Sequence, residues 1–454
     1  MPIDTKLVAV RFGTVVMNYV SDALAVPAPQ VDVVEIQMGA RQRFIITREP
    51  EHVKTVLTTK FKDFGKGPNI HRQWSPFLGN SIFTTDAQQW HDSRSLIRPM
   101  FIKNRISDLT IFERCTAHMM SKIEGSGLEV DIMDLFYRMT LDATTEFLLG
   151  ANINSLDNPA HDFAKAFNDV QRIQMAITLL GPFSSFLPKG PYLNNIQMID
   201  DFVMPYVEAA LALPADELER ITKSDRDFTF LHSIVQYTRD KKLLRDHLVA
   251  ILLAGRDTTA ATLSWALYEL SRYPEKVRLL REEILSVLGT SRTPNYEDLK
   301  NFVYLRRILN ETLRLYPAVP FNLRTALVDS RLEGTDSQPP ISVVKGDTVI
   351  YSPLSMHRRK DLYPPVSDTF ADPGTFSPER WEHWTPRPWQ YLPFNGGPRI
   401  CVGQNFALTE MAYVIVRMLQ KYERIEYVGD WAAQYYVTEL VLQPGQGVCL
   451  RFFK

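Results

Sequence analysis

Residues 240–271 place the strongest constraint on how this chain can fold, because they form one long helical stretch. Apolar residues recur there at steps of three and four, which is the period of an α-helix. Pro274 follows the end of the stretch, where a helix stop is expected. Residues 302–315 show the same pattern and stop before Pro317. Because the sequence pattern from about residue 87 to 310 is mostly helical, the sequence predicts a mainly α chain.

Strand signals occur toward the two ends of the chain. Residues 31–48 alternate and are rich in Val and Ile, which predicts two strands with a turn near Gly39. Residues 341–351 and 435–453 carry further strand signals. The sequence therefore predicts a mainly α fold with small β-sheets, in one large domain rather than a βαβ repeat.

Charge and cysteine content exclude some classes of protein. The 454 residues include 51 basic and 52 acidic side chains, with a net charge of -1, so nothing indicates binding to nucleic acid. The three cysteines, Cys115, Cys401 and Cys449, are too few for a disulfide framework. We expect a reducing compartment, in which each thiol is free for packing or for metal ligation.

The N-terminal residues do not read as a membrane anchor. Residues 7–20 are the best candidate for a span, but they are short and are interrupted by Arg11 and Asn18. They also lack the layout of a cleavable signal peptide. We expect residues 1–32 to be a segment without a clear anchor, ahead of a single domain at residues 33–454.

One cysteine has surroundings that suit chemistry. Cys401 lies in a glycine-rich loop just before an apolar helix expected at residues 402–419. Backbone amides in such a loop, and the positive end of the next helix, favour a thiolate over a thiol. A thiolate is what an iron centre needs from cysteine, and Arg399 is placed to meet a carboxylate of the same cofactor. For Cys115 and Cys449 we expect inert, packed thiols, the commonest fate of a free cysteine.

This loop resembles the heme-binding loop of the cytochrome P-450 family, Phe-x-x-Gly-x-Arg-x-Cys-x-Gly. Phe394, Gly397, Arg399, Cys401 and Gly403 match every fixed position. With each residue type at roughly 5% usage, such a match arises about once in a few million starts. The resemblance implies the cytochrome P-450 fold, heme b (iron protoporphyrin IX) as the cofactor and Cys401 as its metal ligand.

Two further patterns of the family concern its arginines. Trp90 and Arg94 fit Trp-x-x-x-Arg, whose members hold a heme propionate, although alone they would read as a surface arginine over a core tryptophan. Arg324, ten residues past Arg314, stands where the family often has another propionate-binding arginine. The resemblance therefore implies that these residues bind the cofactor together with the Cys401 loop.

A third pattern is structural. Glu311 and Arg314 fit Glu-x-x-Arg, and at i and i+3 they share one helix face. Such spacings usually mark a solvated face, but this face is otherwise apolar, so a buried pair with a further partner is expected. Arg380 matches the family's third member. The resemblance implies a structural network behind the heme.

The middle of the long helix breaks the rules of helix propensity. Gly255 is a poor helix residue, and the side chains of Asp257 and Thr258 compete for backbone hydrogen bonds. A kink without chemistry is the alternative interpretation. Ala254, Gly255, Asp257 and Thr258 match the family's Ala/Gly-Gly-x-Asp/Glu-Thr, which implies a groove where dioxygen is activated. Thr258 would hydrogen-bond the oxygen, and Asp257 would help to deliver protons.

The resemblance covers residue 33 to the C-terminus and is closest to the fungal branch that hydroxylates alkanes and fatty acids, which also includes enzymes of specialised metabolism. It implies a monooxygenase that takes O2 and a small apolar organic substrate, with electrons from NADPH through NADPH-cytochrome P-450 reductase or another donor. Members lie on the cytoplasmic side of the endoplasmic reticulum membrane, so peripheral membrane contact is expected. Two alternatives remain: a heme-thiolate enzyme that rearranges a peroxide without external electrons, and a non-catalytic heme sensor.

Two regions concern the partners. Residues 155–235 mix apolar side chains with Gln, Asn and Ser, which indicates an apolar substrate pocket with a few polar anchors. Scattered basic residues could form a positive face for an acidic electron donor, or they could be solvated charge. These residues are Arg94, Arg98, Lys103, Arg358, Arg359 and Lys360.

Overall fold

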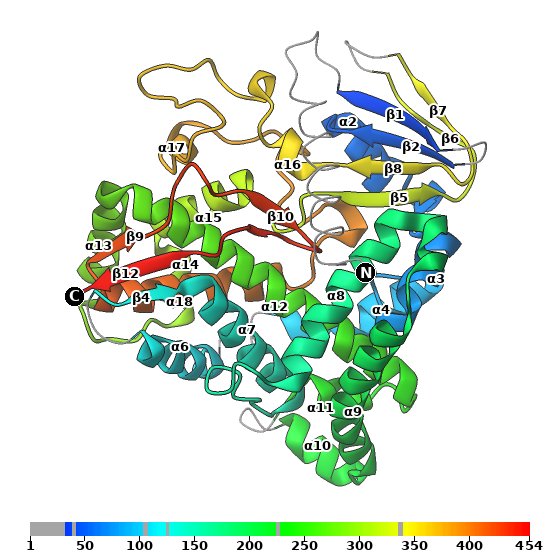
Figure 1. Ribbon diagram of the computed structural model, residues 1–454, viewed down its shortest axis with the longest axis horizontal. Helices are drawn as coiled ribbons and strands as arrows, with labels where there is room; N and C mark the ends of the chain where they lie inside the picture. Colours follow the sequence, from blue (N-terminus) through cyan, green and yellow to red (C-terminus); the bar gives the residue numbers. More distant parts are fainter. Residues whose placement is uncertain (1–31, 39–41, 103–107, 124–126, 224–227, 335–338) are drawn as a thin grey trace, which may run out of the picture.

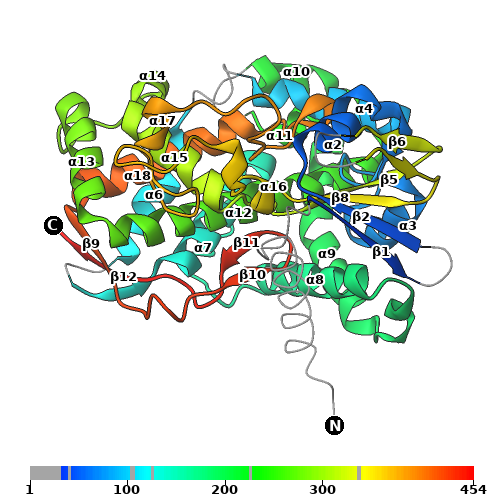
Figure 2. The same ribbon diagram turned by 90° about the horizontal axis from the view of Figure 1, so that it is seen from above.

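Helices make up most of the molecule in the computed structural model, which describes residues 32–38, 42–102, 108–123, 127–223, 228–334 and 339–454. The expected mainly α fold with small sheets is confirmed (Figures 1 and 2). No helix in these ranges combines the length and the apolar character needed to cross a bilayer. The candidate span at residues 7–20 and most of the 1–32 segment lie outside the described residues.

Helix α12 (Lys241–Arg272) is the long helix that the sequence predicts, and it runs without interruption across Gly255. The Asp240 carboxylate caps its start by accepting from the backbone N–H groups of Lys242 (2.9 Å) and Leu243 (3.2 Å). Tyr273 ends the helix, and Pro274 begins the next one. Figure 1 shows α12 crossing the interior of the molecule, with other helices around it.

The other long helices pack around α12 in two groups. On one side lie α6 (Thr110–Lys122), α7 (Ile132–Leu149), α13 (Pro274–Leu288), α15 (Val303–Leu315) and α18 (Gln404–Lys421), which share one apolar core with the second half of α12. A second core joins the first half of α12 to α8 (Asp162–Leu180) and α9 (Gly190–Ala212). The shorter helices are α2 (Pro50–Lys54), α3 (Gly67–Leu78), α4 (Ala87–Ile97), α10 (Ala215–Lys223), α11 (Phe230–Val235), α14 (Tyr296–Asn301), α16 (Pro353–Met356) and α17 (Arg380–His383).

The main sheet has the strand order β1-β2-β8-β5-β3. The predicted antiparallel pair is present as β1 (Val33–Met38) and β2 (Gln42–Thr47), while its expected turn lies outside the described residues. Strand β8 (Thr348–Tyr351) lies parallel to β2 and antiparallel to β5 (Asn322–Ala326). Strand β3 (Phe64–Gly65) pairs with β5 and forms the edge opposite β1. The sheet therefore joins segments far apart in the sequence, including the one that carries Arg324.

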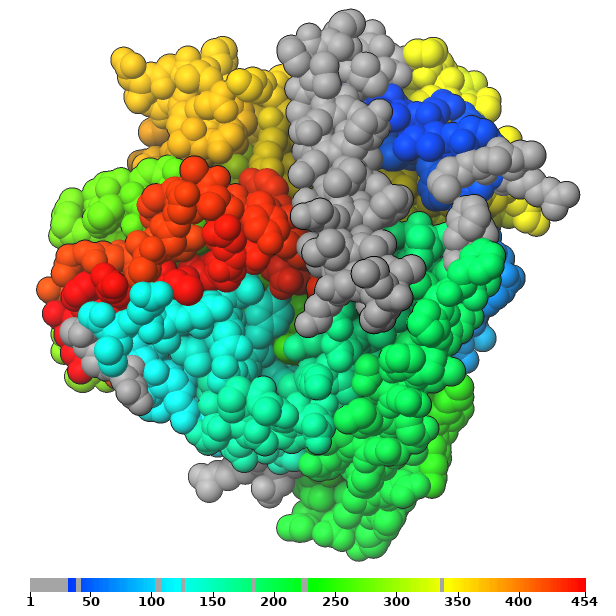
Figure 3. Space-filling view, viewed as in Figure 1, coloured from blue at the N-terminus to red at the C-terminus, as the bar shows by residue number. Residues whose placement is uncertain are grey.

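Three smaller sheets complete the β structure. One pairs β10 (Tyr436–Thr438) with β11 (Leu442–Pro444), and one pairs β6 (Ser330–Leu332) with β7 (Ile341–Val343). The third places β12 (Cys449–Phe453) between β4 (Glu129–Asp131) and β9 (Arg424–Tyr427). The strand signals at residues 341–351 and 435–453 thus each divide between two sheets. The space-filling view in Figure 3 shows the C-terminal strands packed directly against the region of α6 and α7.

Candidate functional site

The loop before α18 has a fixed backbone that presents Cys401. The backbone N–H of Cys401 donates to the Phe394 carbonyl at 2.9 Å. Gly397 has φ +62°, and a Cβ there would lie 2.3 Å from the Leu57 carbonyl oxygen, so only glycine fits. Leu57 belongs to a π-helical turn, Thr55–Thr59, that follows α2. The backbone of the loop at Gly397 therefore packs directly against the backbone of Leu57, with no room for a side chain between them.

The Cys401 residue remains exposed in this loop, in contrast to Cys115, which is buried. Although the residue is exposed, desolvation by the protein atoms around it raises the pKa of the Cys401 thiol, while the backbone N–H of Gly403 and the charge of Arg94 act in the opposite direction. The donors expected from the sequence are present, but desolvation outweighs them in the protein alone. A bound metal cation is what would hold such a sulfur as a thiolate. Burial raises the pKa of Cys115 to about 12, as expected of an inert thiol.

Arg399 and Arg94 share the ring of Trp90. The Arg399 guanidinium lies 4.6 Å from the ring centroid and the Arg94 guanidinium 5.8 Å from it. Arg94 Nη1 donates to the Ile400 carbonyl at 2.9 Å, next to Cys401. Arg399 Nη2 donates to Asp86 Oδ1 at 2.6 Å, whereas its Nε is buried without a partner among the described residues. The sequence pattern paired Trp90 with Arg94, and the structure adds Arg399, so that three residues stack beside Cys401.

A lysine that the sequence analysis did not single out lies with these arginines. Lys66 Nζ and Arg324 Nη1 both donate to Asn322 Oδ1, at 3.3 Å and 2.8 Å. Burial, Arg324 and Arg399 all push the pKa of Lys66 well below its ordinary value, and Asp86 opposes them. Burial and Arg324 likewise lower the pKa of Arg399 to about 10. Desolvated basic side chains clustered in this way make the group a candidate anion site.

The charges in this cluster do not balance. Lys66, Arg324 and Arg399 are three basic side chains, and Asp86 is the carboxylate that opposes them. Asp86 is also occupied by the backbone N–H groups of Lys66 and Gly67, both at 2.8 Å. Desolvated like charges repel, so a ligand with two negative charges would stabilise the cluster. The two propionates of a heme have that charge, and the unpartnered Arg399 Nε offers them a further donor.

Helix α12 presents an accessible strip in its middle. Ala254, Gly255 and Thr258 are partly exposed, although residues 244–252 of the same helix are buried. The Thr258 hydroxyl donates to the Ala254 carbonyl at 2.7 Å. A Cβ on Gly255 would lie 3.1 Å from Thr144 on α7, so glycine permits the close approach of these two helices. The helix is therefore continuous at this point, and its hydroxyl is held in place by the backbone.

Asp257 faces a different neighbour from Thr258. Asp257 is 3% exposed, and its Oδ1 lies 3.2 Å from Arg256 Nη1. The side chain of Gln171, on α8, is a further hydrogen-bond partner of this carboxylate. Burial raises the pKa of this carboxyl, and Arg256 opposes the rise. Consecutive residues of a helix point in different directions. The structure therefore does not bring the Asp257 carboxyl and the Thr258 hydroxyl together.

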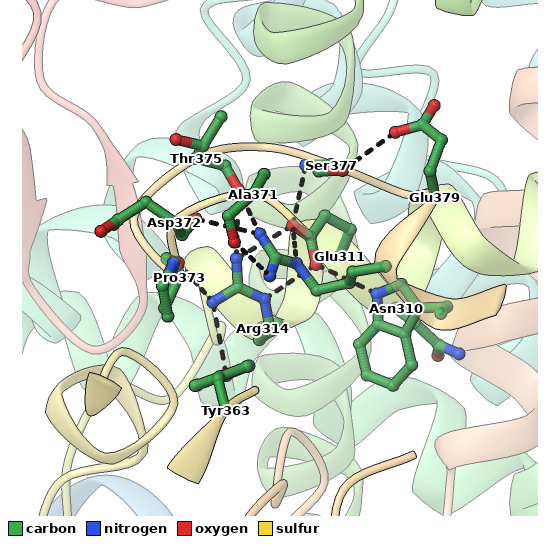
Figure 4. Close-up of polar contacts among 12 residues, drawn as sticks. Asn310, Glu311, Arg314, Tyr363, Ala371, Asp372, Pro373, Thr375, Ser377 and Glu379 are labelled. Carbon is green, nitrogen blue, oxygen red and sulfur yellow. Dashed lines mark hydrogen bonds and ion pairs between the residues drawn. The ribbon is translucent and has the colours of Figure 1, made fainter. Parts of the chain in front are cut away.

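Glu311, Arg314 and Arg380 form a fully buried network (Figure 4). Arg314 holds both oxygens of Glu311, at 2.8 and 2.9 Å, and Arg380 Nε donates to Glu311 Oε1 at 2.9 Å. The remaining donors of the two arginines meet backbone carbonyls of residues 357 and 371–375. The buried pair with a third partner that the sequence predicts is present.

The basic residues proposed as a docking face are not all on the surface. Arg359 is 8% exposed and pairs with Glu49 at 2.8 Å and Asp361 at 2.6 Å, so it cannot contribute to a positive face. Arg358 donates to the Leu315 carbonyl. Arg98 and Lys360 are exposed. Lys103 lies outside the described residues.

Comparisons with known proteins point to one family. The family model described as Cytochrome P450 matches residues 30–444. The cytochrome P450 monooxygenase pvhE of Talaromyces variabilis is 46% identical, over 90% of this chain and 80% of its own length. The cytochrome P450 monooxygenase himC of Aspergillus japonicus is 40% identical, over 90% and 74%. Cytochrome P450 52A13 of Debaryomyces hansenii is 39% identical, over 85% and 77%.

Proposed function

Because the chain belongs to the cytochrome P450 family, we propose that Cys401 binds the iron of its heme and that the enzyme oxidises a small apolar substrate. The protein is an oxidoreductase, a cytochrome P450 monooxygenase, and its cofactor is heme b, with NADPH as the electron source through a reductase. When bound, the heme supplies the activation of O2. The single observation that carries the proposal is the exposed Cys401 in a loop whose backbone is fixed by Gly397 and Phe394.

The test is Cys401→Ala, followed by the spectrum of the reduced protein with carbon monoxide. A thiolate ligand gives a strongly red-shifted band, which should be lost in this variant. Cys449→Ala is the matched control, because Cys449 is a half-buried cysteine on strand β12, and it should keep the band. A red-shifted band that persists in Cys401→Ala would contradict the assignment.

We assign the cationic cluster to the propionates of the heme. Arg324 and Arg399 are retained from the sequence analysis, and Lys66 is added because its Nζ shares Asn322 Oδ1 with Arg324. Arg94 and Trp90 act from the Cys401 side, where Arg94 holds the Ile400 carbonyl and stacks with Trp90. Charge-assisted hydrogen bonds of this kind orient a carboxylate as well as attract it.

Thr258 and Asp257 have separate tasks in this proposal. The Thr258 hydroxyl already donates to the Ala254 carbonyl, so its oxygen is oriented to accept or pass on a proton at the accessible strip of α12. Asp257 is the acid–base group on the α8 side, where burial raises the pKa of its carboxyl and the neighbouring Arg256 opposes the rise. A proton reaches Thr258 from Asp257 only through an intervening group, since the two side chains face different directions.

The class of substrate is inferred from the region that is expected to form the pocket. Helices α8 and α9, from the region expected to form the pocket, supply mainly apolar side chains to the second core, which supports an apolar substrate. Such a substrate is either alkane-like or fatty-acid-like, or a fungal secondary metabolite.

We place the enzyme on the cytoplasmic side of the endoplasmic reticulum, with peripheral membrane contact. Flotation of the purified chain with liposomes before and after a salt wash tests the membrane contact. A peripherally bound protein is released by the wash, so flotation that persists after it would contradict peripheral contact.

A further inference from the structure

The structure contains three histidines that are almost completely buried, and one of them differs from the others. His52 and His357 each have both ring nitrogens in hydrogen bonds. His247, on α12, is 1% exposed, and neither of its nitrogens has a partner among the described residues. An unpaired buried polar group is destabilising, so it calls for an explanation, and a ligand that meets it is one such explanation.

The position of His247 on α12 relates it to the accessible strip. His247, Ile251, Ala254 and Thr258 are spaced by four, three and four residues, which places them on one face of the helix. The two residues before His247 point elsewhere: Arg245 donates to the Phe77 carbonyl, and Asp246 accepts from the backbone N–H of Asn80. The imidazole therefore extends the line of Ala254 and Thr258 toward the N-terminal half of α12.

The ring is suited to a neutral hydrogen bond. Burial lowers the pKa of His247 to about 4, with Asp246 opposing, so the imidazole is uncharged at neutral pH. A neutral imidazole offers one donor and one acceptor. Its complementary partner is a hydroxyl, a carbonyl or a protonated carboxyl group.

From this geometry we propose that His247 is a specificity-determining residue that hydrogen-bonds an oxygen-bearing group of the substrate, at a fixed distance from the carbon that is oxidised. Nine residues separate His247 from the middle of the 254–258 segment, which corresponds to about 13 Å along the helix. An extended chain covers about 1.2 Å per bond, so the oxygen lies roughly eleven bonds from the reacting carbon. The inference rests on the proposed function, because it takes the 254–258 segment as the place of oxidation.

The test uses probes that do not depend on knowing the substrate. N-alkylimidazoles bind a heme iron through the azole nitrogen and extend a chain into the pocket. Each alkyl probe is paired with its ω-hydroxyalkyl analogue of equal length, with tethers from about four to fourteen carbons, and dissociation constants are read from the shift of the heme band. In the wild type the hydroxyl should tighten binding roughly 3- to 10-fold, within a narrow range of tether lengths.

His247→Leu should abolish this advantage, and His247→Phe provides a second variant without the two nitrogens. The matched control is His52→Leu, which removes a buried histidine of helix α2 and should keep the advantage. Its nitrogens bond Thr47 Oγ1 (3.1 Å) and the Glu333 carbonyl (3.0 Å), so it should also lower the melting temperature, whereas His247→Leu should not. No advantage at any length in the wild type, or an equal one in His247→Leu, would overturn the inference. Failure of every azole to shift the heme band would instead overturn the proposed function, and the inference with it.

Discussion

At the scale of single residues, Thr258 is a side chain whose role in the reaction can be tested without disturbing the packing of the fold. It is partly exposed and is oriented by the Ala254 carbonyl. Thr258→Ala should fold and bind heme normally, consume NADPH and release hydrogen peroxide in place of product, because the positioned hydroxyl is lost. Losing one such donor typically costs about 10²–10³ in rate. Thr262→Ala, which removes the same type of bond one turn later (to the Thr258 carbonyl, 2.8 Å), is the control. Tight coupling of NADPH to product in Thr258→Ala would refute the assignment.

Lys66 gives a second prediction at this scale, and its readout is heme retention. Lys66→Met removes one of three positive charges from the cluster and should speed the transfer of heme to a scavenging apoprotein. A charge-assisted hydrogen bond contributes roughly 1.5–3 kcal/mol, so the rate should rise at least about tenfold. Lys66→Arg should largely restore retention. Lys62→Met, which changes an exposed lysine of the same segment, should leave the rate unaltered. Equal rates in Lys66→Met and the wild type would remove Lys66 from the propionate site.

At the scale of elements, the Glu311 network ties α15 to the segment around α17. Arg380→Leu leaves a buried carboxylate with one guanidinium partner fewer, which should lower the free energy of unfolding by about 3–5 kcal/mol. Arg307→Leu removes an ion pair between the same two elements, to Glu382 at 3.0 Å, but at the surface. That change should cost only about 0–1 kcal/mol. Denaturant titrations of both variants measure the difference, and similar losses would show that burial of the network is not what stabilises this junction.

At the scale of the whole molecule, buried titratable groups give the stability a two-sided pH dependence. Burial lowers the pKa of His357 to about 3, so unfolding takes up a proton between about pH 3 and the unfolded pKa near 6.5, and stability rises with pH in that window. Burial raises the pKa of Glu410 to about 8. The folded state then holds the proton more tightly than the unfolded state, whose carboxyl titrates near 4.5. Stability from this group is therefore present below about pH 4.5 and is lost as pH rises toward 8.

Glu410→Gln tests the second half of this dependence. The amide is neutral at every pH, so the variant should lose less stability than the wild type between pH 5 and pH 8. Denaturant midpoints at the two values measure the difference. Glu423→Gln, at an exposed position, should follow the wild type. A parallel pH dependence in wild type and Glu410→Gln would contradict the role of the buried carboxyl.

The sequence by itself determined what local patterns can specify. The spacing of apolar residues predicted α12 and α15 to within a residue at each end, because helix period and caps are local properties. Five fixed positions in one loop identified the family and singled out Cys401. Glu311 and Arg314 were expected to be buried as a pair because the rest of their helix face is apolar.

Only the tertiary structure decided which distant side chains meet. Lys66 joins Arg324 and Arg399 because β3 and β5 pair in the main sheet, a long-range contact that no local pattern encodes. Arg359 leaves the expected positive face because acidic residues that flank the N-terminal strands, and one from its own loop, enclose it. The burial of Asp257 and His247 was likewise decided by the tertiary structure, because the exposure and the partners of a helical residue depend on what packs against its face of the helix. Charge balance and hydrogen-bond satisfaction are sums over the whole fold, and so they could be assessed only once the fold was known.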